Sequence, residues 1–240
     1  MNSIQSHKIC RRMLLIIPAM ILFIIGDYCM GLEPAGSQNV SGMISTGWTS
    51  IADWRFAVSN IGGMLGTALY ALAAFAFVDY LRAKRAVCRN SRDRFWLWVY
   101  IAGLLCGVMV FLYFHLACGT LIHSYNVIAD AAQGNTGRAV QIWQRVYTVQ
   151  AVPFWTTFIV MCLTSTGGWF AVVLRGILPL RKIWVLAAPI AVAGIGFLLE
   201  TLIPFPFHGF ASGFESAGWI IMFLGGIKAV RVDCGALQSA

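Results

Sequence analysis

Residues 96–122 read WLWVYIAGLLCGVMVFLYFHLACGTLI and contain no Asp, Glu, Lys or Arg. A helix needs about 20 mainly apolar residues to cross the hydrocarbon core of a bilayer, so this stretch is long enough to span it with some tilt. The whole chain has the same character, with 59% hydrophobic and 11% charged residues and a mean hydropathy of +0.77. Because a soluble domain carries roughly 25% charged residues, the sequence predicts an integral membrane protein.

Five further apolar blocks of similar length lie on either side of this stretch. Together they predict an all-α fold, a polytopic membrane helix bundle, because a helix satisfies its own backbone hydrogen bonds in lipid. No composition shift marks a domain boundary, so we expect one transmembrane domain over residues 1–240. The six predicted spans cover residues 13–32, 56–81, 96–122, 152–174, 183–203 and 214–230.

The Lys and Arg residues predict the orientation of the bundle. If the N-terminus lies inside, 14 of the 17 Lys and Arg residues fall in cytoplasmic segments, and only Arg55, Arg138 and Arg145 lie outside. Cytoplasmic loops carry the excess of positive charge in membrane proteins. We therefore expect both termini in the cytoplasm, and a multi-pass protein of a bacterial-type cytoplasmic (inner) membrane.

The first apolar block has an alternative interpretation. It follows Lys8, Arg11 and Arg12, and basic residues before an apolar run are also typical of a secretory signal peptide. The block is longer than a typical signal core and ends, from Gly26 to Met30, without a clear cleavage site. Cleavage would leave five spans.

The net charge of +8 indicates which partners to expect. The basic residues form short clusters between apolar blocks and do not cover an amphipathic surface. Such clusters favour membrane lipids as partners, in particular anionic headgroups at the cytoplasmic face. Nucleic acid is not expected.

Ionisable side chains inside a span are costly and by default mark candidate functional sites. In the predicted topology nearly all of them lie in the outer half of the membrane or at its outer surface. Asp79, near the cytoplasmic end of its span, is the exception. We therefore expect a polar pocket that opens outward, with these candidate residues: Asp27, Arg55, Asn60, His115, His123, Glu200, His208 and Glu215.

Three interpretations of this pocket follow from its residue types. The side chains could satisfy one another, for example Arg55 with Asp27 or Glu215, or reach headgroup water. They could bind a ligand, which makes the chain a binding, transport or accessory protein. They could instead carry out acid–base or metal-assisted chemistry on a lipid or amphiphile, with His115 or Glu200 at the reacting atom. In that case the chain is a membrane-embedded enzyme.

The signals for a metal, a nucleotide or a disulfide are weak. His115 and His123 are eight residues apart, about 12 Å along a straight helix, so they cannot hold one ion together. The chain has neither H-E-x-x-H nor the phosphate-binding G-x-x-x-x-G-K-[ST] motif, so no cofactor is indicated. Of the seven cysteines only Cys29 and Cys118 lie toward the external side, where a disulfide could form.

Two external segments and three pairs of small residues complete the prediction. Residues 33–53 are rich in Gly and Ser and predict a flexible loop, while residues 123–150 predict a longer polar loop, part of which could be an interfacial helix. Small residues four apart let helix backbones approach closely in lipid, and we expect them to pack within one bundle. The pairs are Gly62 with Gly66, Gly103 with Gly107, and Ser212 with Ser216.

Three short stretches carry a resemblance to a known family. Ile25-Gly26-Asp27, Asp53-Trp54-Arg55 and the segment from Ser59 to Gly66 are similar to a family of uncharacterised bacterial multi-pass integral membrane proteins. The resemblance covers about the first third of the chain. It implies a fold type and no catalytic residues, and it draws attention to Asp27 and Arg55, which lie within the similar stretches.

Overall fold

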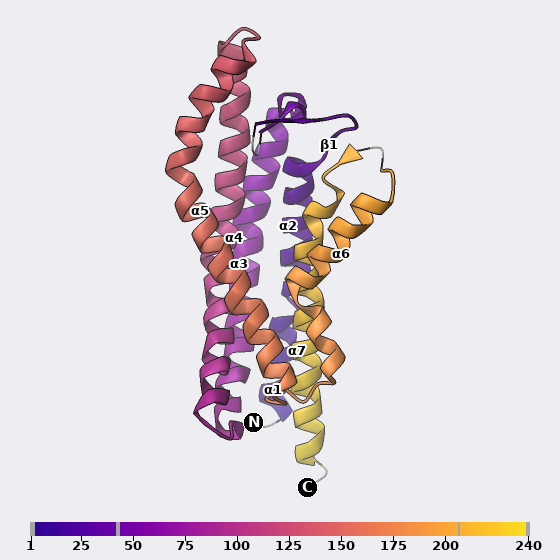
Figure 1. Ribbon diagram of the computed structural model, residues 1–240. Coiled ribbons are helices and arrows are strands. Elements are labelled where there is room, and N and C mark those ends of the chain that lie inside the picture. The colour runs from indigo at the N-terminus through magenta and orange to yellow at the C-terminus, as the bar shows by residue number, and fades with distance from the viewer. Residues whose placement is uncertain (1–2, 42–43, 206, 239–240) are drawn as a thin grey trace.

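The protein is a bundle of helices that run roughly along one long axis (Figure 1). The computed structural model describes residues 3–41, 44–205 and 207–238. The predicted all-helical architecture is confirmed. The helices are α1 (Ser3–Met13), α2 (Ile16–Gly31), α3 (Asp53–Ala83), α4 (Ser91–Ala131), α5 (Thr136–Leu174), α6 (Pro189–Leu202) and α7 (Phe214–Gln238).

Both ends of the described chain lie at one end of the bundle, which we call the terminal end (Figure 1). The turn between α4 and α5 lies at the opposite end, which we call the hairpin end. Two short 3-10 helices, η2 (Lys84–Val87) and η3 (Lys182–Ala187), lie in the connections after α3 and α5.

α1 and α2 form one apolar run from Ile4 to Gly31 with a break at residues 14–15. Pro18 explains this break. A proline ring clashes with the carbonyl four residues earlier, which here belongs to Leu14, and it has no N–H to donate to that carbonyl. Around the break the backbone hydrogen bonds span three residues, as in a 3-10 helix. The N–H of Leu15 donates to the carbonyl of Arg12, and that of Ile17 donates to the carbonyl of Leu14.

Within the described residues, five helical segments are long and apolar enough to cross a membrane, where the sequence predicts six spans. The exception is the predicted span 183–203, which consists of η3 followed by α6. α6 has 14 residues, about 21 Å at 1.5 Å per residue. The division has a local cause, because Pro189 disfavours helical backbone at Ala188, which is extended with ψ 135°.

The η3–α6 segment nevertheless runs from one end of the bundle toward the other. Near the terminal end, the indole of Trp169 in α5 donates to the carbonyl of Trp184 in η3 at 2.7 Å. Beyond α6, strand β4 (Phe207–His208) pairs with β1 (Glu33–Pro34), which directly follows α2. The chain thus returns to the end at which α2 stops before α7 brings it back.

The predicted loop 123–150 is wrong in its secondary structure. α4 continues to Ala131 and α5 begins at Thr136, so the two helices have 41 and 39 residues. The turn between them has positive φ at Gln133 and Gly134, and the side chain of Asn135 accepts from the N–H of Arg138 to cap α5. At about 60 Å, each helix is about twice as long as the hydrocarbon core is thick.

The segment predicted as a flexible loop, residues 33–53, instead packs against this helical hairpin. It contains the short strands β2 (Asn39–Ser41) and β3 (Ile44–Ser45) and the 3-10 helix η1 (Thr46–Ser50). Trp48 in η1 is buried, with its ring edge-to-face against Tyr125 of α4 and Trp143 of α5. This aromatic cluster forms a second core at the hairpin end.

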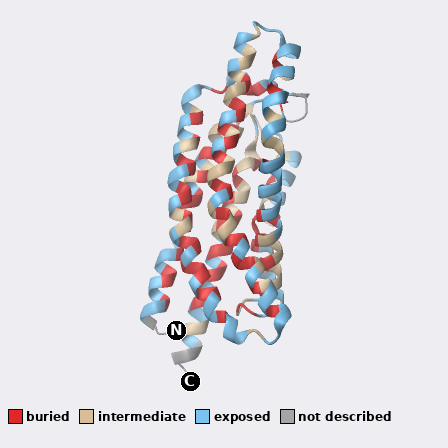
Figure 2. Cartoon of the chain, turned by 90° about the vertical axis from the view of Figure 1, so that its left-hand side faces the viewer, coloured by how far each residue is buried: buried red, intermediate tan, exposed pale blue. Residues whose placement is uncertain are grey.

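Glycines allow the long helices to approach one another, as the sequence predicts. A Cβ added at Gly103 would lie 2.5 Å from the backbone nitrogen of Ser165. One added at Gly62 would lie 3.0 Å from the carbonyl oxygen of Leu22. The main core lies where the helices meet (Figure 2), and at its centre Tyr70, Phe111 and Trp219 meet edge-to-face.

Candidate functional site

A small cavity of about 50 Å³ lies between α2, α4, α5 and α7 and contains three of the eight predicted site residues. Its polar lining consists of Asp27, His115, Ser212, Glu215 and Ser216. Its apolar wall includes Phe111, Phe114 and Phe158. We call this space the polar cavity.

His115 is held rigidly at one side of the polar cavity. The residue is 2% exposed, and its Nδ1 lies 3.3 Å from the hydroxyl of Ser59 in α3. The Phe23 ring of α2 stacks on the imidazole with centroids 4.9 Å apart. Gly63 makes room for it, because an added Cβ there would lie 2.6 Å from the Cβ of His115. These contacts fix where the ring points.

Asp27 faces the other ring nitrogen of this histidine. Its Oδ1 lies 3.8 Å from Nε2 of His115, which is too long for a direct hydrogen bond, and the two groups form an ion pair only when the imidazole is protonated. Its Oδ2 accepts from the hydroxyl of Ser216 at 3.1 Å. If Ser59 donates to Nδ1, then Nε2 carries the proton and presents it toward Asp27.

Glu215 adds a second carboxyl group in the first turn of α7. It accepts from the indole N–H of Trp219, one turn further along, at 3.4 Å. The positive end of the helix dipole favours an acid at this position, with typical effects of about 0.3–1 kcal/mol. That interaction is small compared with the cost of placing a charge in a low-dielectric interior.

No Lys or Arg lines the polar cavity within the described chain. The predicted partner, Arg55, lies elsewhere, because its guanidinium donates to the carbonyls of Tyr28 at 3.0 Å and Leu32 at 2.8 Å. Arg55 thus caps the C-terminal end of α2, where a cation also complements the helix dipole. Asp27 and Glu215 are left without a permanent countercharge.

The other predicted residues do not join the polar cavity. Glu200 accepts from the backbone N–H groups of Gly209 at 2.6 Å and Ala211 at 2.9 Å. It therefore fixes the connection between α6 and η4 (Phe210–Gly213). His208 is exposed in β4, with Glu33 as its partner in the strand register.

His123 and Asn60 lie on the α3–α4 contact closer to the hairpin end. His123 is half-buried and has its Nδ1 3.3 Å from a carboxylate oxygen of the largely exposed Asp53. Asn60 faces Gly119, at which an added Cβ would lie 2.7 Å from its Oδ1. The single eight-residue pocket expected from the sequence is thus divided into one cavity and several local contacts.

Three serines of the site were not predicted as such. Ser212 and Ser216 were interpreted only as a packing pair, yet their spacing of four residues also places two hydroxyls on one side of the chain, facing the cavity. Ser59 lies within a stretch that carries the family resemblance. Its spacing to His115 in the sequence gives no hint of their contact, which depends on how α3 packs against α4.

Ser59, His115 and Asp27 form an array that resembles a serine-hydrolase triad in its residue types. The geometry argues against that chemistry. Ser59 is fully buried and is not part of the cavity lining, so its hydroxyl has no access to a substrate carbonyl. Ser59 is therefore a residue that orients the imidazole.

Neither a metal cluster nor a disulfide is found among the residues that the structure describes. No group of three or more His, Cys, Asp and Glu side chains could hold a metal ion there. Cys29 and Cys118 are both free thiols.

Comparison with known proteins identifies a family and no activity. One family model, described as a family of unknown function (DUF6796), matches residues 1–232. No curated protein and no solved structure matches the chain. The match extends far beyond the first third of the chain, which is all that the sequence resemblance covers, and it agrees with an uncharacterised family.

Proposed function

Because the chain belongs to this family of unknown function, we propose its role from its own geometry: it is a membrane protein that binds a proton or a small cation in the polar cavity. This role makes it a binding, transport or accessory protein. The observation that carries the proposal is the burial of two carboxyl groups, Asp27 and Glu215, in one cavity whose described lining has no Lys or Arg.

The charge balance of the cavity supports this ligand class. An ionised carboxylate away from water is unfavourable unless an opposite charge or several donors compensate it. Asp27 has one hydroxyl donor, in Ser216, and Glu215 has one indole donor, in Trp219. A proton or a cation bound between these groups supplies the missing positive charge, and Nε2 of His115 lies 3.8 Å from the Asp27 carboxylate.

The size of the cavity supports a small ligand. A volume of about 50 Å³ exceeds the 10–15 Å³ needed to hold one water molecule but is far below the roughly 300 Å³ of a drug-sized ligand site. A larger solute would require the aromatic wall to move.

Infrared spectroscopy of the purified protein tests this proposal. We expect a carbonyl stretch from a protonated carboxylic acid that disappears as pH rises or as Na⁺ or Li⁺ is added. The band should be lost or altered in Asp27→Asn and Glu215→Gln. Glu200→Gln is the matched control, since that carboxylate binds backbone N–H groups outside the cavity. A wild-type spectrum without such a band, and without a change on adding cations, would refute the proposal.

We propose further that the chain is a multi-pass protein of a bacterial cytoplasmic membrane with both termini inside and η3–α6 as a sixth crossing. The distribution of Lys and Arg supports this topology, as does the run of η3–α6 along the bundle. Reporter fusions test it: a reporter in the turn at residues 133–134 should be external, and one at residues 88–90 internal. The reverse pattern would contradict the topology.

An enzyme that acts on a lipid or amphiphile is the second candidate. The observation that favours it is the imidazole held beside a carboxyl group at a cavity, which is an arrangement suited to acid–base chemistry. The cavity volume favours the binding role, because a lipid carbonyl would have to enter a space of about 50 Å³.

A further inference from the structure

A second cavity, of about 380 Å³, lies at the terminal end between α1 and α7. Arg11 of α1 and Arg231 of α7 contribute positive charge to its lining, and Ser6 and His7 contribute further polar groups. Leu14 and Val230 line it as well. We call this space the α1–α7 groove.

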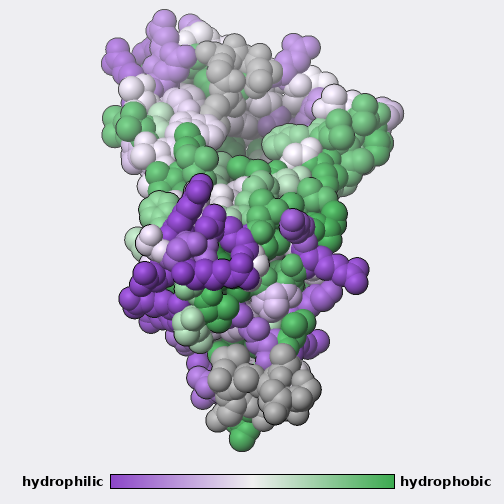
Figure 3. All heavy atoms as spheres, turned by 60° about the horizontal axis from the view of Figure 1, so that its bottom comes forward, coloured by the Kyte–Doolittle hydropathy of each residue, from purple (hydrophilic) through white to green (hydrophobic). Residues whose placement is uncertain are grey.

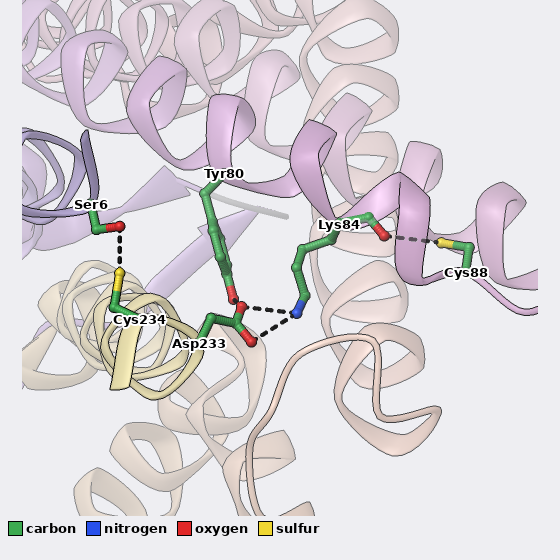
Figure 4. A network of polar contacts seen from close by, with 6 residues as sticks. All are labelled: Ser6, Tyr80, Lys84, Cys88, Asp233 and Cys234. Atoms are coloured by element: carbon green, nitrogen blue, oxygen red, sulfur yellow. Dashed lines mark hydrogen bonds and ion pairs between the residues drawn. The ribbon is translucent and has the colours of Figure 1, made fainter. Parts of the chain in front are cut away.

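The α1–α7 groove has an excess of positive charge. No Asp or Glu is part of its described lining. The acid closest to it along α7, Asp233, points away toward Tyr80 and Lys84 (Figure 4). Lys84 lies 2.8 Å from this carboxylate and the Tyr80 hydroxyl donates to it at 2.6 Å, so the charge of Asp233 is already balanced.

The same contacts hold the two walls of the groove in place. Cys234, the residue after Asp233, points toward Ser6 of α1 and hydrogen-bonds with its hydroxyl (Figure 4). α7 is therefore tied to α3 through Asp233 and to α1 through Cys234. A site between two fixed helices loses little conformational freedom when a ligand binds.

The polar and apolar residues of the groove follow one another along the helices. Leu14, in the break between α1 and α2, lies about one turn beyond Arg11 in the direction of the bundle interior and is 38% exposed. A ligand that fits has an anionic head with an apolar part beside it. Guanidinium groups bind phosphate oxygens through paired N–H donors.

A neighbouring cavity of about 390 Å³ provides an internal comparison. It lies on the other side of α1, against α3, and its cations are Lys8, Arg12 and Arg82. An acid, Asp79, lies among them and repels a phosphate. Hydrophilic side chains are numerous on the face of the terminal end that Figure 3 shows, and both cavities have cations in their lining, so positive charge alone does not distinguish them. The acid-free lining of the α1–α7 groove does.

We propose that the α1–α7 groove binds an anionic phospholipid of the adjacent leaflet, with the phosphate between Arg11 and Arg231 and the upper acyl chain against Leu14. Basic pockets between membrane helices are a known way to bind such headgroups. This inference does not depend on the proposed role of the polar cavity.

Native mass spectrometry of the detergent-purified protein with added lipids tests the proposal. We expect phosphatidylglycerol or cardiolipin to bind at least about tenfold more tightly than phosphatidylcholine, since one to two charge-assisted contacts are at stake. Arg11→Gln with Arg231→Gln should abolish this preference. The double Lys variant, which keeps both charges, should retain part of it and shows that the fold tolerates changes at these positions.

Arg12→Gln is the matched control, because it removes the same charge from the adjacent residue on the other side of α1. It should leave the lipid preference within about twofold, as expected for a distant surface charge screened by solvent. An equal loss in Arg12→Gln would refute a defined site and indicate general surface charge. Equal binding of phosphatidylcholine would also refute the proposal. Binding of millimolar inorganic phosphate, without binding of phosphatidylglycerol or cardiolipin, would show that the groove takes free phosphate and not a lipid.

Discussion

Carboxylates at the terminal end of the bundle and carboxylates in the polar cavity are treated differently by the fold. At the terminal end, Asp233 pairs with Lys84 at 2.8 Å and Asp93 pairs with Arg175 at 2.6 Å. In the polar cavity, Asp27 accepts from the Ser216 hydroxyl and Glu215 from the Trp219 indole. The imidazole of His115 also lines the cavity, and no Lys or Arg is part of its described lining. Asp233 and Asp93 join helices through ion pairs, whereas Asp27 and Glu215 have no Lys or Arg as a partner.

This difference predicts which acids stabilise the fold. An acid with a permanent cation beside it should be needed in its charged form. An acid without one should tolerate neutralisation and lose only its ligand. Four substitutions with progressively smaller expected losses of thermal stability, measured on the detergent-purified protein, test the contacts that hold these groups.

Asp93→Asn should give the largest loss. Asp93 is 5% exposed, accepts from Arg175 and also accepts from the backbone N–H of Arg89 at 3.1 Å. Removing the carboxylate leaves the guanidinium of Arg175 without its partner charge, so we expect the largest fall in thermal midpoint of the four substitutions. Asp79→Asn at an exposed position should cost less than about 0.5 kcal/mol. Equal losses in Asp93→Asn and Asp79→Asn would show that the ion pair with Arg175 does not stabilise the fold.

Gly63→Ala should destabilise by about 2 kcal/mol, the range for overpacking a tight core. The added Cβ would lie 2.6 Å from the Cβ of His115, so either the imidazole or α4 has to move. Gly194→Ala in α6 is the control, because nothing lies within 4 Å of its added Cβ. If Gly63→Ala is tolerated as well as Gly194→Ala, His115 is not held as tightly as the packing indicates.

Tyr80→Phe should cost about 1 kcal/mol, the usual net value of one hydrogen bond. The substitution removes the hydroxyl that donates to Asp233 at 2.6 Å and leaves Lys84 in place. A loss as large as that of Asp93→Asn would mean that the hydroxyl, and not the ammonium, holds Asp233. The thermal midpoint of unfolding measures the difference.

The sequence predicted those features of the fold that depend on neighbouring residues, and it missed those that depend on residues far apart along the chain. The length of an apolar block is a local property, and it located the five membrane-length helical segments of the described chain. The spacing of small residues is also local, and it located the close approach at Gly103. The continuation of α4 through residues 123–131 was missed because polar residues there suggest a loop, while a helix outside the hydrocarbon core can expose them to water. Trp48 gave no local signal of burial, since its partners Tyr125 and Trp143 are far along the chain.

The site was predicted in part for the same reason. Hydropathy and topology placed Asp27, His115 and Glu215 in one half of the bundle, and they do meet. The same argument misplaced Arg55 and Glu200, whose partners are backbone groups at the end of α2 and in the connection after α6. Which carbonyl or N–H is left without a partner at a helix end depends on where the helix stops, and composition does not determine that position to one residue.

Asp27→Asn should change the free energy of unfolding by less than about 1 kcal/mol, the smallest effect in this series. The amide oxygen can still accept from Ser216, and the substitution removes a charge that has no Lys or Arg to balance it. The same variant should lose the cation-sensitive infrared band, so that stability and ligand binding separate at one residue. A loss as large as that of Asp93→Asn would show instead that His115 and Asp27 form a permanent ion pair, and the polar cavity would then be part of the scaffold.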